Sequence, residues 1–131
     1  MNFDAIMKMS TTKDLLTDKP EAKGTKQYLL MVNKIIEAFL SKDTSILQRI
    51  YNMWYCAFFL RSWRHWLKFK KFSTEDNCVT LNTYTCIELN AHGIVLMLEK
   101  CRQNNDIDSF LPWLLSSQVC EKTFRQLRSM T

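Results

Sequence analysis

The sequence contains few of the residues that end helices and form tight turns. Only two glycines, Gly24 and Gly93, and two prolines, Pro20 and Pro112, occur among its 131 residues. Two-residue hairpins depend on glycine at their turns, and proline inside a helix costs about 3 kcal/mol. Because no proline interrupts residues 21–111, the sequence predicts an all-α fold, an irregular bundle of about four to five helices.

The sequence also lacks the ligand spacing of a structural zinc site. None of its five cysteines forms a Cys-x-x-Cys pair, and His65 and His92 do not flank such a pair. Zinc sites use closely spaced Cys and His ligands. Cysteines of odd number among apolar neighbours are typical of reduced thiols, so we expect an intracellular protein, nuclear or cytoplasmic.

No hydrophobic run is long enough to cross a membrane. The longest, MWYCAFFL over residues 53–60, is far shorter than the roughly 20 residues that a spanning helix needs. Asp4 and Lys8 interrupt the N-terminal stretch where a secretory signal would be apolar. The phosphate-binding motifs G-x-x-x-x-G-K-[ST] and G-x-G-x-x-G are missing too. We expect a soluble protein without a membrane partner.

Hydrophobic spacing predicts the order of the helices. Residues 1–24 are weakly patterned and predict a weakly ordered lead-in, followed by a helical domain over residues 25–131. Apolar residues three and four apart predict a first long helix from Thr25 to about Ser41.

A second long helix is expected over residues 45–70, with Asp43 or Thr44 as its cap. Up to Leu60 it is apolar on nearly every face, which predicts a central, largely buried element. Aromatic residues at helical spacing dominate packing. The aromatic residues that we expect in the core are Trp54, Trp63, Trp66 and Trp113, with Phe58 and Phe59.

The second half of the chain alternates loops and helices. Residues 72–80 read as a loop, 81–102 as a third long helix and 103–109 as a turn rich in Asn and Asp. Beyond the turn, a bulky cluster needs a partner surface and predicts a protein-docking site as an alternative function. Its members are Leu111, Trp113, Leu114 and Leu115.

Positive charge is concentrated in one helix-sized segment. Residues 41–72 contain seven Lys or Arg and one Asp, a net charge of +6, whereas residues 73–112 carry −4. At 100° per residue, five of the basic residues beyond Leu60 fall within one arc, opposite a set of bulky apolar residues. We call this arc the basic face; its members are Arg61, Arg64, His65, Lys68 and Lys71.

The basic face has two interpretations. Lys and Arg beside aromatic rings can follow a phosphate backbone and stack on exposed bases, which predicts binding of nucleic acid. Alternatively, the face is solvated surface that the acidic residues of 75–76 and 106–108 neutralise. Salt separates DNA binding from docking through the apolar cluster, because only the former weakens steeply with ionic strength.

By spacing alone, Glu121 is an ordinary charge on a terminal helix. Ser116 or Ser117 caps this helix, and Glu121 suits the positive end of the dipole and pairs with Arg125 four residues later. Magnesium chemistry needs two or more converging carboxylates, and this helix supplies one.

Two stretches resemble known proteins: TYTCIELNAH (83–92) and FLPWLLSSQVCEKTFRQLRSMT (110–131). They are similar to the C-terminal region of transposase-derived proteins of the P-element, THAP-associated kind, and more loosely to hAT transposases. These families insert an all-helical segment into an RNase H-like core, and the last acidic residue of their D-D-E set follows it. Ser117, Glu121, Phe124 and Arg128 match the helix that carries this residue.

The resemblance implies roles for particular residues. Residues 45–112 would correspond to the insertion, and 113–131 to the helix that carries Glu121 as catalytic and metal-binding glutamate. Arg125 and Arg128 would join the basic face as nucleic-acid contacts. A complete parent protein would be a DNA transposase that cuts and joins strands with Mg²⁺ or Mn²⁺.

The sequence departs from that pattern upstream. The two aspartates of a D-D-E site normally come from upstream β-strands, and nothing before or after Pro20 reads as a strand that carries Asp. The THAP zinc module is missing as well. We therefore expect a transposase-derived helical fragment without a complete RNase H sheet. By itself it would hold no cofactor and have no nuclease activity, and its partner would be DNA or another protein chain.

Overall fold

The computed structural model describes residues 23–115, which form three long helices and three short helical turns. In chain order these are α2 (Lys23–Phe39), α3 (Ile46–Phe69), α4 (Thr74–Asn77), α5 (Leu81–Gln103), η2 (Ile107–Ser109) and η3 (Pro112–Leu115). Within this part of the chain there is no strand, so the all-α prediction is confirmed.

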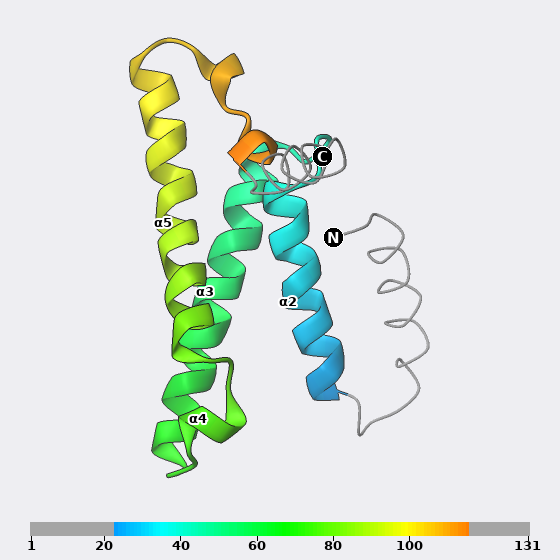
Figure 1. Ribbon diagram of the computed structural model, residues 1–131, viewed down its shortest axis with the longest axis vertical. Coiled ribbons are helices and arrows are strands. Elements are labelled where there is room, and N and C mark those ends of the chain that lie inside the picture. The colour runs from blue at the N-terminus through cyan, green and yellow to red at the C-terminus, as the bar shows by residue number, and fades with distance from the viewer. Residues whose placement is uncertain (1–22, 116–131) are drawn as a thin grey trace, which may run out of the picture.

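The central helix is α3, which packs against both α2 and α5. Figure 1 shows α3 running antiparallel to its two neighbours, with α4 and the start of α5 at one end of the molecule. The α2–α3 connection and the two 3-10 turns lie at the opposite end (Figure 1). The C-terminal end of α3 thus lies far from the end where its N-terminus meets α2.

Short polar side chains start the helices. The Ser45 hydroxyl accepts a hydrogen bond from the Gln48 backbone N–H at 3.3 Å, and Thr80 likewise caps α5 through Thr83 at 3.2 Å. The predicted caps Asp43 and Thr44 are wrong, because the residue with an extended backbone next to the first helical turn is Ser45. The expected loop over 72–80 also contains one helical turn, α4, capped by Ser73.

Helices α3 and α5 end in the same backbone motif. After α3, the Phe72 N–H donates to the Leu67 carbonyl at 2.9 Å and the Lys71 N–H to the Lys68 carbonyl at 3.0 Å. These two bonds define a Schellman motif, which requires a left-handed residue just past the helix. Lys71 takes that conformation with φ 58°, and Asn105 does so after α5 with φ 53°.

The core lies along α3 and is shared by both neighbouring helices. Its members are Met31, Ala38, Met53, Cys56, Ala57, Leu60, Ile87, Ala91, Ile94 and Phe110. Small alanines on all three long helices leave room for the backbones to approach, while methionine and leucine fill the space between them. One continuous core therefore joins the three helices.

The α2–α3 junction buries two polar side chains, Arg49 and Asn52. The Arg49 guanidinium donates to the Ala38 carbonyl at 2.7 Å and to the Ser41 carbonyl at 2.6 Å. The Asn52 side chain donates to the Glu37 carboxylate at 3.0 Å. Within residues 23–115, every buried side-chain nitrogen or oxygen has a hydrogen-bond partner.

Helix α3 is the central element, as expected, but its apolar first half is not buried on every side. Leu47 is 78% exposed, Tyr51 57% and Phe58 55%. Among residues 23–115, long helices lie on only two sides of α3, and part of its aromatic half is exposed. The aromatic residues predicted to form the core lie instead at its margin: Trp54, Phe59, Trp63 and Trp113 are half-buried, and Trp66 is exposed.

Candidate nucleic-acid interface

The predicted basic face divides into two parts in the structure. Arg61 and Arg64 are half-buried and face α5. The Arg61 guanidinium donates hydrogen bonds to both carboxylate oxygens of Glu88, with its Nε at 2.7 Å from one of them. The guanidinium of Arg64 lies 4.7 Å from the ring centroid of Tyr84. These two arginines therefore join α3 to α5.

The ion pair between Arg61 and Glu88 is charged at neutral pH. Hydrogen bonds from the Arg61 guanidinium lower the pKa of Glu88, and the bond to this carboxylate raises the pKa of Arg61. The acidic partner is thus Glu88 on α5, and not the acidic residues of 75–76 or 106–108. Because Glu88 already neutralises Arg61, little net charge remains there for a ligand.

The second part of the basic face is exposed at the end of α3. His65 and Lys68 lie in the last turns of the helix, and Lys70 and Lys71 form the turn that follows. We call these four residues the basic tip. The two ion pairs within residues 23–115 are Arg61–Glu88 and Arg102–Glu99, so no described carboxylate pairs with a lysine of the tip.

Lys70 is a member of the tip that the helical arc missed. At 100° per residue it falls outside the predicted face. The helix ends at Phe69, however, and Lys70 is its C-cap residue, so a helical projection no longer applies. The run of residues 68–72, KFKKF, was the sequence signal that could have identified it.

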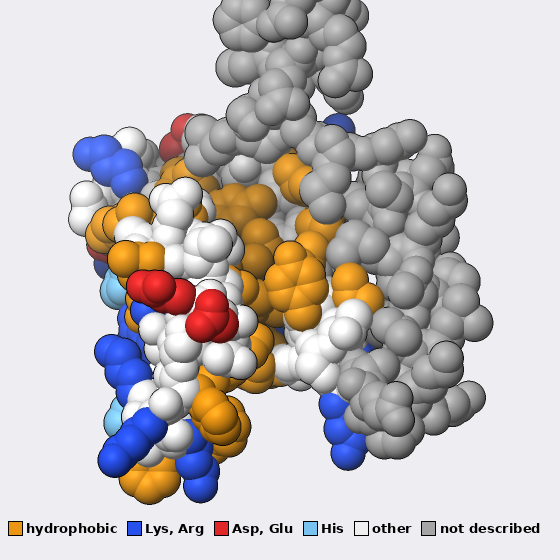
Figure 2. All heavy atoms as spheres, turned by 60° about the horizontal axis from the view of Figure 1, so that its bottom comes forward, with side chains coloured by type: hydrophobic (Ala, Val, Ile, Leu, Met, Phe, Trp, Pro, Cys, Tyr) orange, Lys and Arg blue, Asp and Glu red, His pale blue; other side chains and the backbone are white. Residues whose placement is uncertain are grey.

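Three exposed aromatic side chains lie among these cations. Trp66 is 50% exposed, Phe69 74% and Phe72 54%, and we call them the tip aromatics. The rings of Trp66 and Phe72 lie 6.0 Å apart, and Lys70 Nζ lies 5.7 Å from the ring centroid of Phe69. Figure 2 shows Lys and Arg side chains gathered at one corner of the molecule with hydrophobic side chains beside them.

A structural role explains only part of this cluster. Cations near the C-terminus of a helix interact favourably with the negative end of its dipole, by about 0.3–1 kcal/mol each. Lys68 is the basic residue in the last turn of α3, so that role accounts for its charge. Lys70 and Lys71 also lie at this end of the helix, but no carboxylate within residues 23–115 pairs with either of them.

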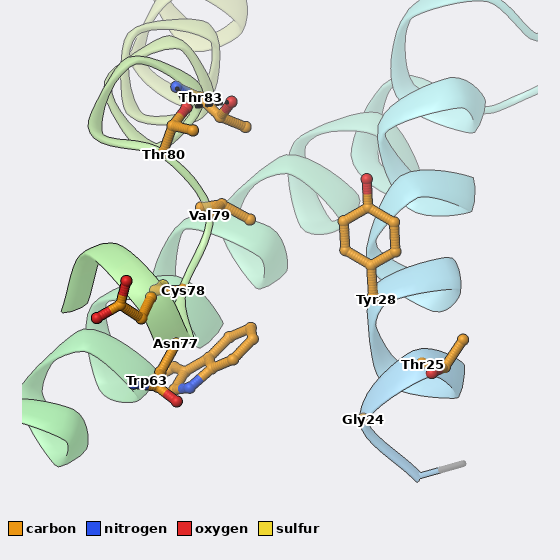
Figure 3. A pocket seen from close by; sticks show the side chains of 10 residues that line it. Gly24, Thr25, Tyr28, Trp63, Asn77, Cys78, Val79, Thr80 and Thr83 are labelled. Carbon is orange, nitrogen blue, oxygen red and sulfur yellow. Dashed lines mark hydrogen bonds between the residues drawn. The ribbon is translucent and has the colours of Figure 1, made fainter. Parts of the chain in front are cut away.

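An open cleft of about 600 Å³ lies near the same end of the molecule. Figure 3 shows Tyr28 on α2 across this cleft from Trp63 on α3, with Thr80 and Thr83 at the start of α5. Its lining supplies hydroxyls and rings, with a single carboxylate from Asp76. Among residues 23–115, no three His, Cys, Asp or Glu side chains are grouped so that they could hold a metal ion.

A second hollow, of about 510 Å³, is an apolar groove along α3. It is lined by Tyr51, Trp54, Tyr55, Phe58, Phe59 and Ser62. Lys34 from α2 lies over two of its rings, with Nζ 4.8 Å from the centroid of Tyr55 and 5.1 Å from that of Tyr51. This groove is chemically suited to an apolar partner.

The apolar cluster predicted as a docking site packs in part against its own chain. Pro112 is fully buried, and the Trp113 ring lies 5.0 Å from the guanidinium carbon of Arg49. Leu111 is half-buried and Leu114 is 57% exposed. Leu111 and Trp113 are thus partly covered by their own chain and Leu114 is not, so docking through this cluster stays a prediction.

The remaining predicted site residues lie outside the described part of the chain. These are Glu121, Arg125 and Arg128.

Within the described part of the chain, Cys56 is not an accessible nucleophile, because burial raises the pKa of its thiol to about 11. No helix within residues 23–115 is both long enough and apolar enough to cross a membrane.

Comparison with known proteins found no relative of this chain. No protein-family model, no curated protein and no solved structure matches this chain.

Proposed function

We propose that this protein binds nucleic acid through the basic tip at the C-terminal end of α3. The observation that carries the proposal is the exposure of Lys68, Lys70 and Lys71 without a carboxylate partner among residues 23–115. Lysines that contact phosphates release condensed counterions, which drives binding without regard to sequence. A polyanion is the ligand that such a group of cations favours most.

The backbone of the tip supports this role because it is held in place. Leu67 is only 3% exposed, and its carbonyl accepts the hydrogen bond that closes the Schellman motif. The cations therefore extend from a fixed turn at the end of a helix anchored in the core. Phosphate-binding side chains on a fixed backbone lose less conformational entropy on binding than side chains on a free loop.

The proposal includes no catalytic step. The basic tip consists of three lysines and a histidine, and the tip aromatics beside it add only rings, so no nucleophile lies next to a base. A transposase-derived origin, which the resemblance of residues 83–92 and 110–131 implies, agrees with DNA as the ligand. We accordingly propose a non-catalytic helical module whose parent protein acted on DNA.

Docking onto another protein is the second candidate function. The apolar groove around Trp54 and Phe58 is the observation that favours it, since exposed aromatic surface is enriched at interfaces. Binding in this groove would depend little on salt, in contrast to binding at the basic tip. Replacing Phe58 with Ser would then weaken binding to the partner and leave DNA affinity unchanged.

The test is the salt dependence of DNA binding, measured by fluorescence anisotropy with labelled DNA from roughly 50 mM salt upwards. The double variant Lys68→Gln, Lys70→Gln should bind more weakly. Its slope of log affinity against log salt should be shallower by about 1.8 for duplex DNA or about 1.4 for single strands.

A matched control removes two charges at the other end of the molecule. Lys42 and Lys100 are exposed, and Lys42→Gln, Lys100→Gln gives the same net charge as the test variant. This control should keep the wild-type slope. Lack of binding at about 50 mM salt would refute the proposal, and so would an equal loss in both double variants.

A further inference from the structure

The tip aromatics are unusual because large apolar side chains generally lie inside folded proteins. Phe69 is 74% exposed, more than any aromatic residue elsewhere in residues 23–115. Trp66 and Phe72 contact each other yet remain half exposed. Packing within this part of the chain therefore leaves three rings at one end of α3 with free faces.

The rings and the lysines alternate along a short stretch. Residues 68–72 read Lys, Phe, Lys, Lys, Phe, and Trp66 lies one helical turn before Lys70. A chain with charged phosphates on one side and flat bases on the other presents the complementary pattern. In a duplex the faces of the bases are stacked on one another, so a protein ring reaches them only in an unpaired strand.

We propose that the tip aromatics stack on unpaired bases, so that the basic tip prefers single-stranded nucleic acid to a duplex. This inference rests on the nucleic-acid binding proposed above and names the class of its ligand. The lysines hold the phosphates, and the rings of Phe69 and of the Trp66–Phe72 pair contact bases. Because every base has a stacking face, the tip binds with little sequence preference.

An anionic lipid surface is the competing ligand, since aromatic and basic residues also meet at membrane surfaces. An interfacial helix, however, lays a long apolar face along the membrane. Tyr51 and Phe58 are exposed on α3 as well, but the lysines of the basic tip lie only at its C-terminal end, beside Trp66, Phe69 and Phe72. The geometry thus favours a strand across the tip.

The experiment compares a labelled single strand with a hairpin duplex that carries the same number of phosphates, at equal salt. We expect the wild type to bind the single strand more tightly. Phe69→Ala should weaken single-strand binding by about 10-fold, the effect of losing one stacked base, and change duplex affinity less than about 2-fold. The salt slope should stay unchanged, because no charge is lost.

Two control variants separate stacking from folding. Phe69→Tyr keeps a ring and should retain the wild-type preference. Tyr51→Ala removes a ring that is also exposed, but at the other end of α3, and should have no effect. Far-UV circular dichroism of each variant establishes that the helices persist.

The outcomes distinguish this inference from the proposed function. If single strand and duplex bind equally, with the same dependence on Lys68 and Lys70, the inference is wrong and nucleic-acid binding stands. If neither nucleic acid binds and vesicles of phosphatidylserine and phosphatidylcholine do, both proposals are wrong. If Phe69→Ala weakens single-strand and duplex binding equally, the ring does not select unpaired bases.

Discussion

A buried arginine closes the C-terminal end of α2. Arg49 is 1% exposed, and besides its short bonds to Ala38 and Ser41 its guanidinium donates at longer range to the carbonyls of Glu37 and Lys42. The last carbonyls of a helix lack partners within the helix and carry partial negative charge. Burial lowers the pKa of Arg49, but a guanidinium still remains protonated.

Replacing Arg49 with Met should therefore destabilise the protein by about 2–4 kcal/mol, because several buried carbonyls lose their donor at once. Arg49→Lys keeps the charge but cannot donate to the carbonyls of both Ala38 and Ser41. Its stability should therefore lie between that of Arg49→Met and that of the wild type. Urea unfolding followed by circular dichroism measures the difference. A loss below about 0.5 kcal/mol in Arg49→Met would show that water replaces the guanidinium at little cost.

At the scale of elements, the turn after α3 contains backbone strain that the equivalent turn after α5 avoids. A residue with a Cβ in the left-handed region costs roughly 1–2 kcal/mol, except that Asn tolerates it better. Lys71 and Asn105 occupy the same position of the Schellman motif. The turn that carries the basic tip is therefore the less favourable of the two.

Lys71→Gly should stabilise the protein by about 0.5–1 kcal/mol, because glycine has no Cβ to oppose the positive φ. Asn105→Gly should stabilise the protein by a smaller amount, because Asn already tolerates a positive φ. Both are measured by thermal unfolding, with nucleic-acid affinity as a second measurement. Lys71→Gly should raise stability while it weakens binding, so a variant in which the two quantities fall together would contradict our account of this turn.

The ion pair between α3 and α5 makes stability depend on pH. Arg61 lowers the pKa of Glu88 below its ordinary value of 4.5, so the folded state binds this proton less readily than the unfolded state. The contribution of the pair is complete above that value. It is lost as the pH falls through the lower pKa of the folded state.

Glu88→Gln should therefore be less stable than the wild type at pH 7. The two proteins should converge as the pH falls from 4.5 to below the folded pKa of Glu88. Urea unfolding at a series of pH values measures this convergence. Glu99→Gln is the matched control, because Glu99 pairs with Arg102 on the surface of a single helix. A constant difference between wild type and Glu88→Gln at every pH would contradict the assignment.

At the scale of the whole molecule, one core links the three long helices. Met53, Cys56, Ala57 and Leu60 on α3 belong to the same buried cluster as residues from α2 and α5. Within residues 23–115, neither outer helix has a core separate from that of α3. We therefore expect this part of the chain to unfold as one cooperative unit.

Unfolding followed by tryptophan fluorescence and by far-UV circular dichroism should give coincident curves, because three tryptophans lie on α3 and the helices depend on the shared core. Met53→Ala removes a buried side chain. It should lower the free energy of unfolding by about 2–5 kcal/mol, and both measurements should give the same loss. A fluorescence transition that precedes the loss of helix would indicate that α3 separates from one neighbour first.

Sequence patterns predicted the helices well and their surroundings less well. The first long helix was expected over 25–41 and lies at Lys23–Phe39, since apolar spacing defines the middle of a helix better than its ends. Hydrophobicity alone could not identify Arg49 and Asn52 as buried, because their partners belong to the preceding helix and connection. The exposure of Leu47 likewise depends on how many helices surround α3.

The basic face illustrates the same limit for the candidate site. Helical geometry placed five basic residues on one face, but it could not reveal that Glu88, 27 residues away, pairs with Arg61. Nor could it place Lys70, which lies past the end of the helix. Within the described chain, two features thus decide which basic residues are free to bind a ligand: the contact between α3 and α5, and the end of α3 at its C-cap Lys70.

The hydrogen bonds from Arg49 to the end of α2 also limit insertions and deletions in the connection between α2 and α3. Surface connections commonly accept extra residues at small entropic cost. Between Ala38 and Ser41, however, one added residue would move one of the two carbonyls out of reach of the guanidinium. The length of this connection is therefore fixed by a side chain from the following helix. By its composition alone, the connection is a loop that would accept extra residues.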